Sequence, residues 1–243
     1  MRRAFLVWAV FSIAWLANSV RTRGVSDEVL RSSATVTVSD TPATLEFSPR
    51  ATTKSSALIF ICGGDVSAHA YAPLLHPLAE SGFPVFVVKL PYRFAPADSH
   101  KEAAIARAHS VVTSHPDVSR WVISGHSLGG ALASRMARSD PARFAAMVLI
   151  GTTHPKEIDL SSLTIPVTKV YGSNDGVAPR DRVIANRHLL PPHTRWVEVE
   201  GANHSQFGHY GHQLLDGKAA IGREAQQAVT RSALLEALMG DGA

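Results

Sequence analysis

One stretch decides the fold: Trp121-Val122-Ile123-Ser124-Gly125-His126-Ser127-Leu128-Gly129-Gly130. A β-branched run leads directly into Gly-x-Ser-x-Gly, and residues 131–137 are typical of a helix. In this strand–turn–helix context the motif marks a nucleophile elbow, whereas an isolated match would be only a tight turn. Gly125 and Gly129 keep the sharp turn open, since side chains at these positions would collide. We therefore expect Ser127 to expose its hydroxyl at the carboxyl end of a strand, before a helix N-terminus.

An acidic partner for this serine is expected after the next strands. Residues 166–171 form a predicted strand, a Gly- and Asn-containing loop follows, and Pro179 suits the first turn of a helix over 180–190. Asp175 lies in that loop, at the carboxyl end of the strand. It is the candidate acid. An Asx turn or a helix N-cap is the alternative role for this residue.

A histidine is expected last, because the chain order in this type of site is Ser, acid, His. Residues 194–200 form another predicted strand, which runs into Gly201-Ala202-Asn203-His204. The chain has 12 histidines, and position selects among them. His204 is the candidate base, with His209 and His212 as weaker candidates. An ordinary surface histidine is the alternative interpretation.

Two backbone amides are needed to hold the oxyanion of an acyl-transfer intermediate. The amide of Leu128 follows the serine directly. The second donor is expected in the loop after the strand 57–61, where we choose Gly64. Gly63 and Asp65 are neighbours that stay possible, as does a simple Gly-Gly turn.

Further residues are candidates for substrate contact. His126 is the variable residue of the elbow, while Gln206 and Tyr210 follow the candidate base closely. Gln206 and Tyr210 could form a pocket wall, brace the His204 loop, or belong to a loop folded onto its own body. The histidines after position 203 have no Cys, Asp or Glu at ligand spacing, so we expect no metal and no cofactor.

The whole chain is typical of one α/β domain. It has 243 residues, 45% hydrophobic and 18% charged, and a net charge of +4 without a basic run, which argues against nucleic acid. Strands are predicted at 35–38, 44–47, 57–61, 85–88, 121–124, 146–151, 166–171 and 194–200, and helices at 71–81, 101–114, 131–137, 180–190 and 224–239. The alternation predicts a mostly parallel, twisted sheet of about eight strands with helices on both faces. Only residues 152–165 separate the sixth and seventh strands, so no cap domain is expected.

The N-terminal residues are typical of an export signal. Arg2 and Arg3 precede an apolar run over residues 4–17, and small residues follow. We interpret residues 1–19 as a signal peptide cleaved after Ser19, with an uncleaved membrane anchor as the alternative. Residues 20–33 are a predicted linker, and residues 34–243 form the domain. We expect an exported protein, periplasmic or extracellular, that touches a membrane only if the N-terminal segment is retained.

With the elbow, Asp175 and His204 in order, the sequence from residue 35 onward resembles an α/β-hydrolase. Segments 62–91 and 201–227 resemble the α/β-hydrolase fold-5 group, which is related to dienelactone hydrolases. This resemblance implies a Ser-His-Asp hydrolase with a serine nucleophile. Dienelactone hydrolases proper use cysteine, and the single cysteine here, Cys62, is interpreted as a buried strand-end thiol.

We therefore expect hydrolysis of small-molecule carboxylic esters through an acyl-enzyme. A thioesterase, amidase or acyltransferase would use the same apparatus. A catalytically silent, membrane-anchored binding protein on this fold is the alternative from a different class. The oligomeric state and the acyl specificity do not follow from the sequence.

Overall fold

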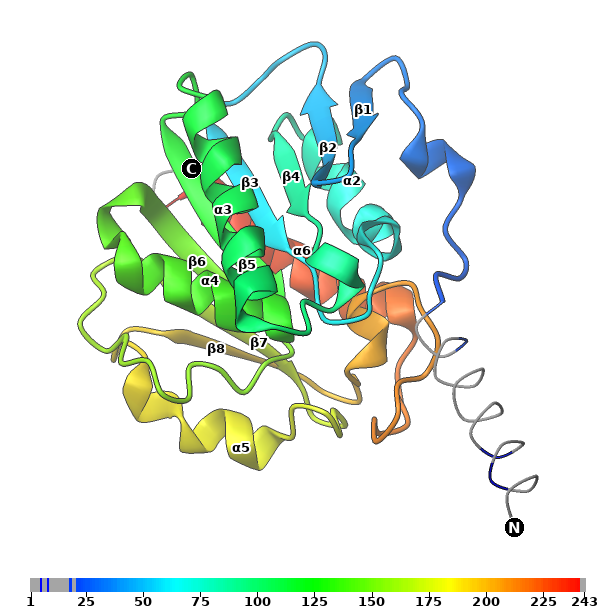
Figure 1. The fold of residues 1–243 in the computed structure, drawn as a ribbon, viewed down its shortest axis with the longest axis vertical. Coiled ribbons are helices and arrows are strands. Elements are labelled where there is room, and N and C mark those ends of the chain that lie inside the picture. Colours follow the sequence, from blue (N-terminus) through cyan, green and yellow to red (C-terminus); the bar gives the residue numbers. More distant parts are fainter. Residues whose placement is uncertain (1–4, 6–7, 9–17, 19–20, 241–243) are drawn as a thin grey trace.

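The computed structural model describes residues 21–240, together with the single positions 5, 8 and 18. An eight-stranded sheet forms its centre, in the order β1-β2-β4-β3-β5-β6-β7-β8 (Figure 1). The strands are β1 (Val36–Asp40), β2 (Thr44–Pro49), β3 (Ser56–Ile61), β4 (Val85–Val88), β5 (Arg120–His126), β6 (Phe144–Ile150), β7 (Val167–Gly172) and β8 (Arg195–Val199). β1 and β2 pair antiparallel, as do β2 and β4, and all pairs from β4 to β8 are parallel. The predicted fold class is confirmed.

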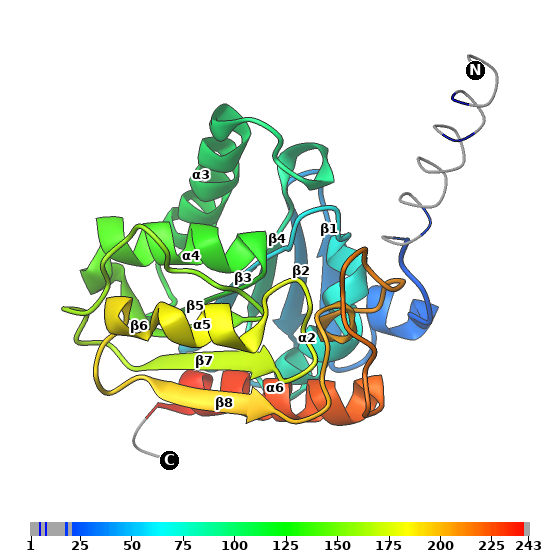
Figure 2. The ribbon, with the colours of Figure 1, turned by 90° about the horizontal axis from the view of Figure 1, so that it is seen from below.

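Helices cover both faces of the sheet. Helices α2 (Ala72–Glu80) and α6 (Arg223–Met239) lie on one face, whereas α3 (Asp98–Ser114), α4 (Leu128–Ser139) and α5 (Arg180–Ala185) lie on the other (Figure 2). β3 is buried along its whole length between these layers, as its continuous apolar sequence requires. The core thus lies on both sides of the central strands, and it fixes the carboxyl ends from which the functional loops emerge.

One predicted helix is shorter than expected. The pattern over 180–190 predicted a single helix, but α5 ends at Ala185 and a 3₁₀ turn occupies Arg187–Leu189. Two prolines follow at 191 and 192. The residue before a proline is pushed out of the helical region, and Leu190 is accordingly extended, with φ −112° and ψ 157°.

The connection between β6 and β7 contains no helix or strand over residues 151–166. No cap domain is inserted at this point, as the short spacing predicted. The carboxyl edge of the sheet is therefore bordered by loops alone in this region.

The signal peptide or anchor predicted for residues 1–19 lies outside the described residues, apart from positions 5, 8 and 18. No helix within the described residues combines the length and apolarity required to cross a membrane. The segment predicted to be a linker is packed onto the domain. It contains a 3₁₀ helix, Asp27–Leu30, and Val25 and Val29 pack against the core. Thr22 forms a β-bridge with Tyr210.

Candidate functional site

The serine elbow is built by close backbone packing. Ser127 joins β5 to α4 with φ 54° and ψ −117°, a conformation that is strained for a residue with a side chain. A Cβ built on Gly125 would lie 2.3 Å from the carbonyl carbon of Gly129. A Cβ built on Gly129 would lie 2.0 Å from the carbonyl oxygen of Ile61. Both positions therefore require glycine, for the reason that the sequence motif suggested.

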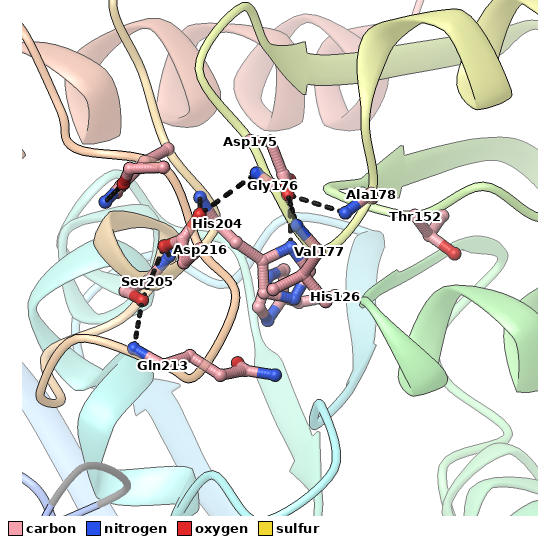
Figure 3. A network of polar contacts seen from close by, with 12 residues as sticks. His126, Thr152, Asp175, Gly176, Val177, Ala178, His204, Ser205, Gln213 and Asp216 are labelled. Atoms are coloured by element: carbon pink, nitrogen blue, oxygen red, sulfur yellow. Dashed lines mark hydrogen bonds and ion pairs between the residues drawn. The ribbon is translucent and has the colours of Figure 1, made fainter.

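Asp175 and His204 form a buried pair. His204 Nδ1 lies 2.8 Å from Asp175 Oδ2, and both side chains are almost fully buried. Asp175 Oδ1 accepts hydrogen bonds from the amides of Val177 (2.9 Å) and Ala178 (2.6 Å), as Figure 3 shows. Asp175 thus forms an Asx-type turn and also contacts the histidine, so the two roles considered for it coexist.

The protonation of this pair follows from its partners. A carboxylate only accepts, so Nδ1 of His204 carries the proton of this bond, and in the corresponding neutral tautomer Nε2 is the acceptor. Nε2 is buried and has no hydrogen-bond partner among the described residues. The ring of His126 lies 4.5 Å from that of His204 between centroids, and Ser127 is the next residue after His126. Within the described residues, Ser127 Oγ and His204 Nε2 form no hydrogen bond, so the structure links the serine to His204 only through the neighbouring ring of His126.

His126 is held in a fixed, neutral state. The amide of Gly63 donates to the hydroxyl of Tyr71 (3.0 Å), and that hydroxyl lies 2.9 Å from Nδ1 of His126. A hydroxyl that accepts from Gly63 still has its own proton to donate to Nδ1. Burial lowers the pKa of His126 well below its usual value, and the neighbouring His204 lowers it further. A neutral ring under His204 avoids like-charge repulsion when His204 gains a proton.

Of the three candidate donors in the loop after β3, only the Gly64 amide has no acceptor within the described residues. The Gly63 amide is bonded to Tyr71, and the Asp65 amide donates to the carbonyl of Arg93 at 2.9 Å. In the described part of the chain, the amides of Gly64 and Leu128 have no acceptor. A Cβ built on Gly64 would lie 3.8 Å from Leu128 Cδ2, so the two residues adjoin.

The structure places Tyr210 and Gln206 in the brace of the His204 loop. Tyr210 is buried, and its hydroxyl donates to the carbonyl of His204 at 3.3 Å. The amide of Gln206 donates to Asn203 Oδ1 (3.1 Å), and its carbonyl accepts from Gln227 Nε2 (3.2 Å). Tyr210 thus supports the loop through its side chain, whereas Gln206 does so through its backbone, and Gln206 Oε1 is buried without a hydrogen-bond partner among the described residues.

The environment of Cys62 does not favour a cysteine nucleophile. Cys62 is buried at the end of β3, and burial raises the pKa of its thiol to about 12. The thiol is therefore protonated and unreactive at neutral pH. Among the residues described, no three His, Cys, Asp or Glu side chains gather as a metal site.

A cavity of about 290 Å³ lies between α3, α4 and the β6–β7 connection, and Leu128 is part of its lining. Its apolar lining comes from Leu128, Ala131, Leu132 and Ile158, and its polar lining from Asp98, Lys101, Arg135, His154 and Glu157. Leu128 follows the elbow serine in the chain, whereas Ser127, Gly64 and His204 are not part of the cavity lining.

Two residues of this region were not singled out by sequence reasoning: Tyr71 and Asp216. Both lie inside segments that carry the family resemblance, but no local motif indicates a hydrogen bond to a residue distant in the chain. Tyr71 connects the loop after β3 to the elbow. Asp216 contacts the loop of the candidate base.

The sheet order, the elbow after β5 and the Asp and His loops after β7 and β8 define an α/β hydrolase. Residues 57–228 match the model of the alpha/beta hydrolase family, and the chain belongs to that family. A protein of Mycobacterium phage D29 named a non-heme haloperoxidase is 30% identical over 109 residues, covering 41% of this chain. The match spans only 37% of the length of that curated relative.

Solved structures share the fold at low sequence identity. A ferulic acid esterase from Streptomyces cinnamoneus aligns with a TM-score of 0.64 and 18% identity, over 78% of this chain and 68% of its own. A thermophilic esterase from Thermogutta terrifontis gives 0.61 and 14%, over 86% and 100%. An alpha-beta serine hydrolase homologue from Coxiella burnetii gives 0.59 and 16%, over 84% and 97%.

Proposed function

We propose that this protein is a serine hydrolase that cleaves carboxylic esters of small molecules through an acyl-enzyme. The observation that carries the proposal is the buried Asp175–His204 pair, which leaves Nε2 of His204 without a partner while the His204 ring packs against His126, the residue before the elbow serine. An acceptor nitrogen in this position is suited to remove the proton of a serine hydroxyl.

In the first half-reaction, Ser127 Oγ attacks the ester carbonyl while His204 Nε2 takes the hydroxyl proton. The tetrahedral intermediate collapses when the protonated His204 gives this proton to the departing alkoxide, which leaves as the alcohol. In the second half-reaction, His204 takes a proton from water, the hydroxide attacks the acyl carbonyl, and the proton returns to Ser127 as the acid departs. Atoms and protons balance without a cofactor.

The amides of Leu128 and Gly64 stabilise the oxyanion of both intermediates. Neither amide has an acceptor within the described residues. One such donor contributes about 10²–10³ in kcat in known hydrolases. Such donors stabilise an oxyanion best when their positions are fixed before the reaction. The neighbouring amides of Gly63 and Asp65 form hydrogen bonds within the protein, and these bonds fix the loop that carries Gly64.

Asp175 has two roles in this reaction. It orients the ring of His204, and its negative charge stabilises the protonated form of His204. The two amides on Asp175 Oδ1 keep that carboxylate from rotating, so that Oδ2 faces Nδ1. The neutral ring of His126 packs against His204 without adding positive charge.

Ester chemistry is supported by the names of two structural neighbours, a ferulic acid esterase and a thermophilic esterase, which are statements about those proteins. The apolar part of the cavity next to Leu128 offers room for one arm of an ester substrate. Thioesters and acyl acceptors other than water belong in the same substrate screen.

The test is labelling with a fluorophosphonate probe, followed by mass spectrometry of the modified peptide. We expect label on Ser127 alone, and a loss of p-nitrophenyl ester hydrolysis of about 10⁴-fold or more in Ser127→Ala. Ser134→Ala is the matched control, because Ser134 lies on the helix that follows Ser127 and its hydroxyl donates to the Gly130 carbonyl. Undiminished hydrolysis by folded Ser127→Ala would refute the proposal.

A further inference from the structure

A second carboxylate, Asp216, lies between the loops that carry Asp175 and His204, and the proposed chemistry does not use it. Its Oδ1 accepts hydrogen bonds from the amides of His204 (3.0 Å) and Gly176 (3.3 Å). Its Oδ2 accepts from the amide (2.8 Å) and the hydroxyl (2.6 Å) of Ser205. Figure 3 shows these contacts converging on one side chain.

The hydrogen-bond donors to Asp216 belong to two different loops. His204 and Ser205 belong to the loop of the base, whereas Gly176 directly follows Asp175 in the loop of the acid. These two loops come from different strands, β8 and β7. A single carboxylate therefore ties together the backbones on which the two members of the pair are mounted.

The segment that carries Asp216 is itself pressed against the acid loop. A Cβ built on Gly176 would lie 2.2 Å from the carbonyl oxygen of Leu215. A Cβ built on Gly217 would lie 2.0 Å from the carbonyl oxygen of Asn174. On the other side, Asn203 Nδ2 donates to the Gly217 carbonyl at 2.8 Å. The backbone on either side of Asp216 is thus held, by close packing at Leu215 and Gly217 and by the Asn203 side chain.

Asp216 does not compete with Asp175 for the imidazole. Both of its oxygens face backbone amides or the Ser205 hydroxyl, while the Nδ1 proton of His204 goes to Asp175. Hydrogen bonds from amides to an ionised carboxylate are shorter and stronger than those between neutral groups. A neutral side chain of the same shape would fasten the two loops less firmly.

We propose that Asp216 is a positioning residue, which sets the separation of Asp175 and His204 by clamping the acid loop to the base loop. The inference rests on the proposed function, because its effect on turnover matters only if His204 is the base. The clamp acts through the 2.8 Å contact between His204 Nδ1 and Asp175 Oδ2. Substrate binding is not involved.

The experiment compares Asp216→Ala and Asp216→Asn with the wild type. For a p-nitrophenyl ester, we expect kcat to fall about 10–100-fold in Asp216→Ala, as is typical when a support of an active residue is lost. KM should stay within about twofold. Asp216→Asn keeps one acceptor oxygen, so part of kcat should return. Asp140→Ala is the control, since Asp140 pairs with Arg143 at the far end of α4.

A second readout reports the pair directly. The Nδ1 proton of His204 should give a low-field ¹H resonance, assigned by its loss in His204→Gln. We expect this resonance to broaden or move upfield in both Asp216 variants and to stay unchanged in Asp140→Ala. A residue that only stabilised the fold would lower the melting temperature without moving this signal in the folded protein.

The outcomes separate this proposal from the proposed function. Wild-type kcat and an unshifted resonance in folded Asp216→Ala would overturn the positioning role, whatever Ser127→Ala shows. If Asp216→Ala does not fold, the same two measurements on Asp216→Asn decide. If Ser127→Ala stays active, the hydrolase mechanism fails, while the resonance still tests whether Asp216 holds the pair.

Discussion

Lys169 gives a prediction whose magnitude follows from the structure. Its ammonium group is buried in β7 and donates to the carbonyl of His154. Burial lowers the pKa of Lys169 from 10.5 to about 7. The folded protein therefore releases this proton near neutral pH, whereas the unfolded chain keeps it up to about pH 10.5.

The sign and size of the effect follow from proton linkage. Between these two pKa values the unfolded state binds more protons, so the free energy of unfolding rises with pH. Each pH unit contributes up to about 1.4 kcal/mol, and from pH 7 to pH 9 the gain is roughly 2 kcal/mol because the transition begins at pH 7. This is a large part of a typical domain stability of about 5–15 kcal/mol.

The assay is urea unfolding of the wild type and of Lys169→Met at pH 7, 8 and 9. We expect the wild type to gain roughly 2 kcal/mol over this range relative to the variant. Burial also lowers the pKa of His154, to about 4, but that group changes the stability only below pH 7. The comparison with the variant cancels groups common to both proteins. Identical pH dependence in the two proteins would refute the reasoning.

Three other predictions concern the elbow, the thiol and the N-terminus. Gly129→Ala should prevent correct folding, because its Cβ would meet the Ile61 carbonyl oxygen, whereas Gly222→Ala, with open space around it, should fold normally. Soluble yield and melting temperature check this, and a Gly129→Ala protein as stable as the wild type would contradict it. Cys62 should resist iodoacetamide at pH 8 in the folded protein and react in urea, because burial raises its pKa to about 12; fast labelling of folded protein would contradict this. For an exported protein, intact mass should correspond to cleavage after Ser19; a full-length mass would instead favour the anchor.

The sequence predicted the fold well because its signals are local. The β-branched runs, the glycines of the elbow and the order of Ser127, Asp175 and His204 each depend on a few neighbouring residues or on chain order. Physical constraints such as the contact between Gly129 and the Ile61 carbonyl leave little freedom at these positions. The strands were accordingly placed within a few residues of their observed ends.

The supporting contacts could not be predicted in the same way. Tyr71 reaches His126, which is 55 positions away, through a hydroxyl whose direction depends on the packing of α2 against the sheet. Asp216 was visible only as part of a resemblance, and its partners depend on how two loops meet. Residues 21–33 have a polar composition that suggests a linker, yet a β-bridge and a few apolar side chains fasten them.

β8 has a consequence for how this protein would lose activity. Like β1, it is an edge strand of the sheet; it pairs with β7, and the loop that follows it carries His204. Edge strands unfold locally at a lower free-energy cost than central strands. Local unfolding of β8 would therefore move His204 away from Ser127 and Asp175 while β3 and β5 stay folded. Heat inactivation should then precede the loss of bulk secondary structure. Amide hydrogens of residues 195–206 should exchange faster than those of residues 56–61.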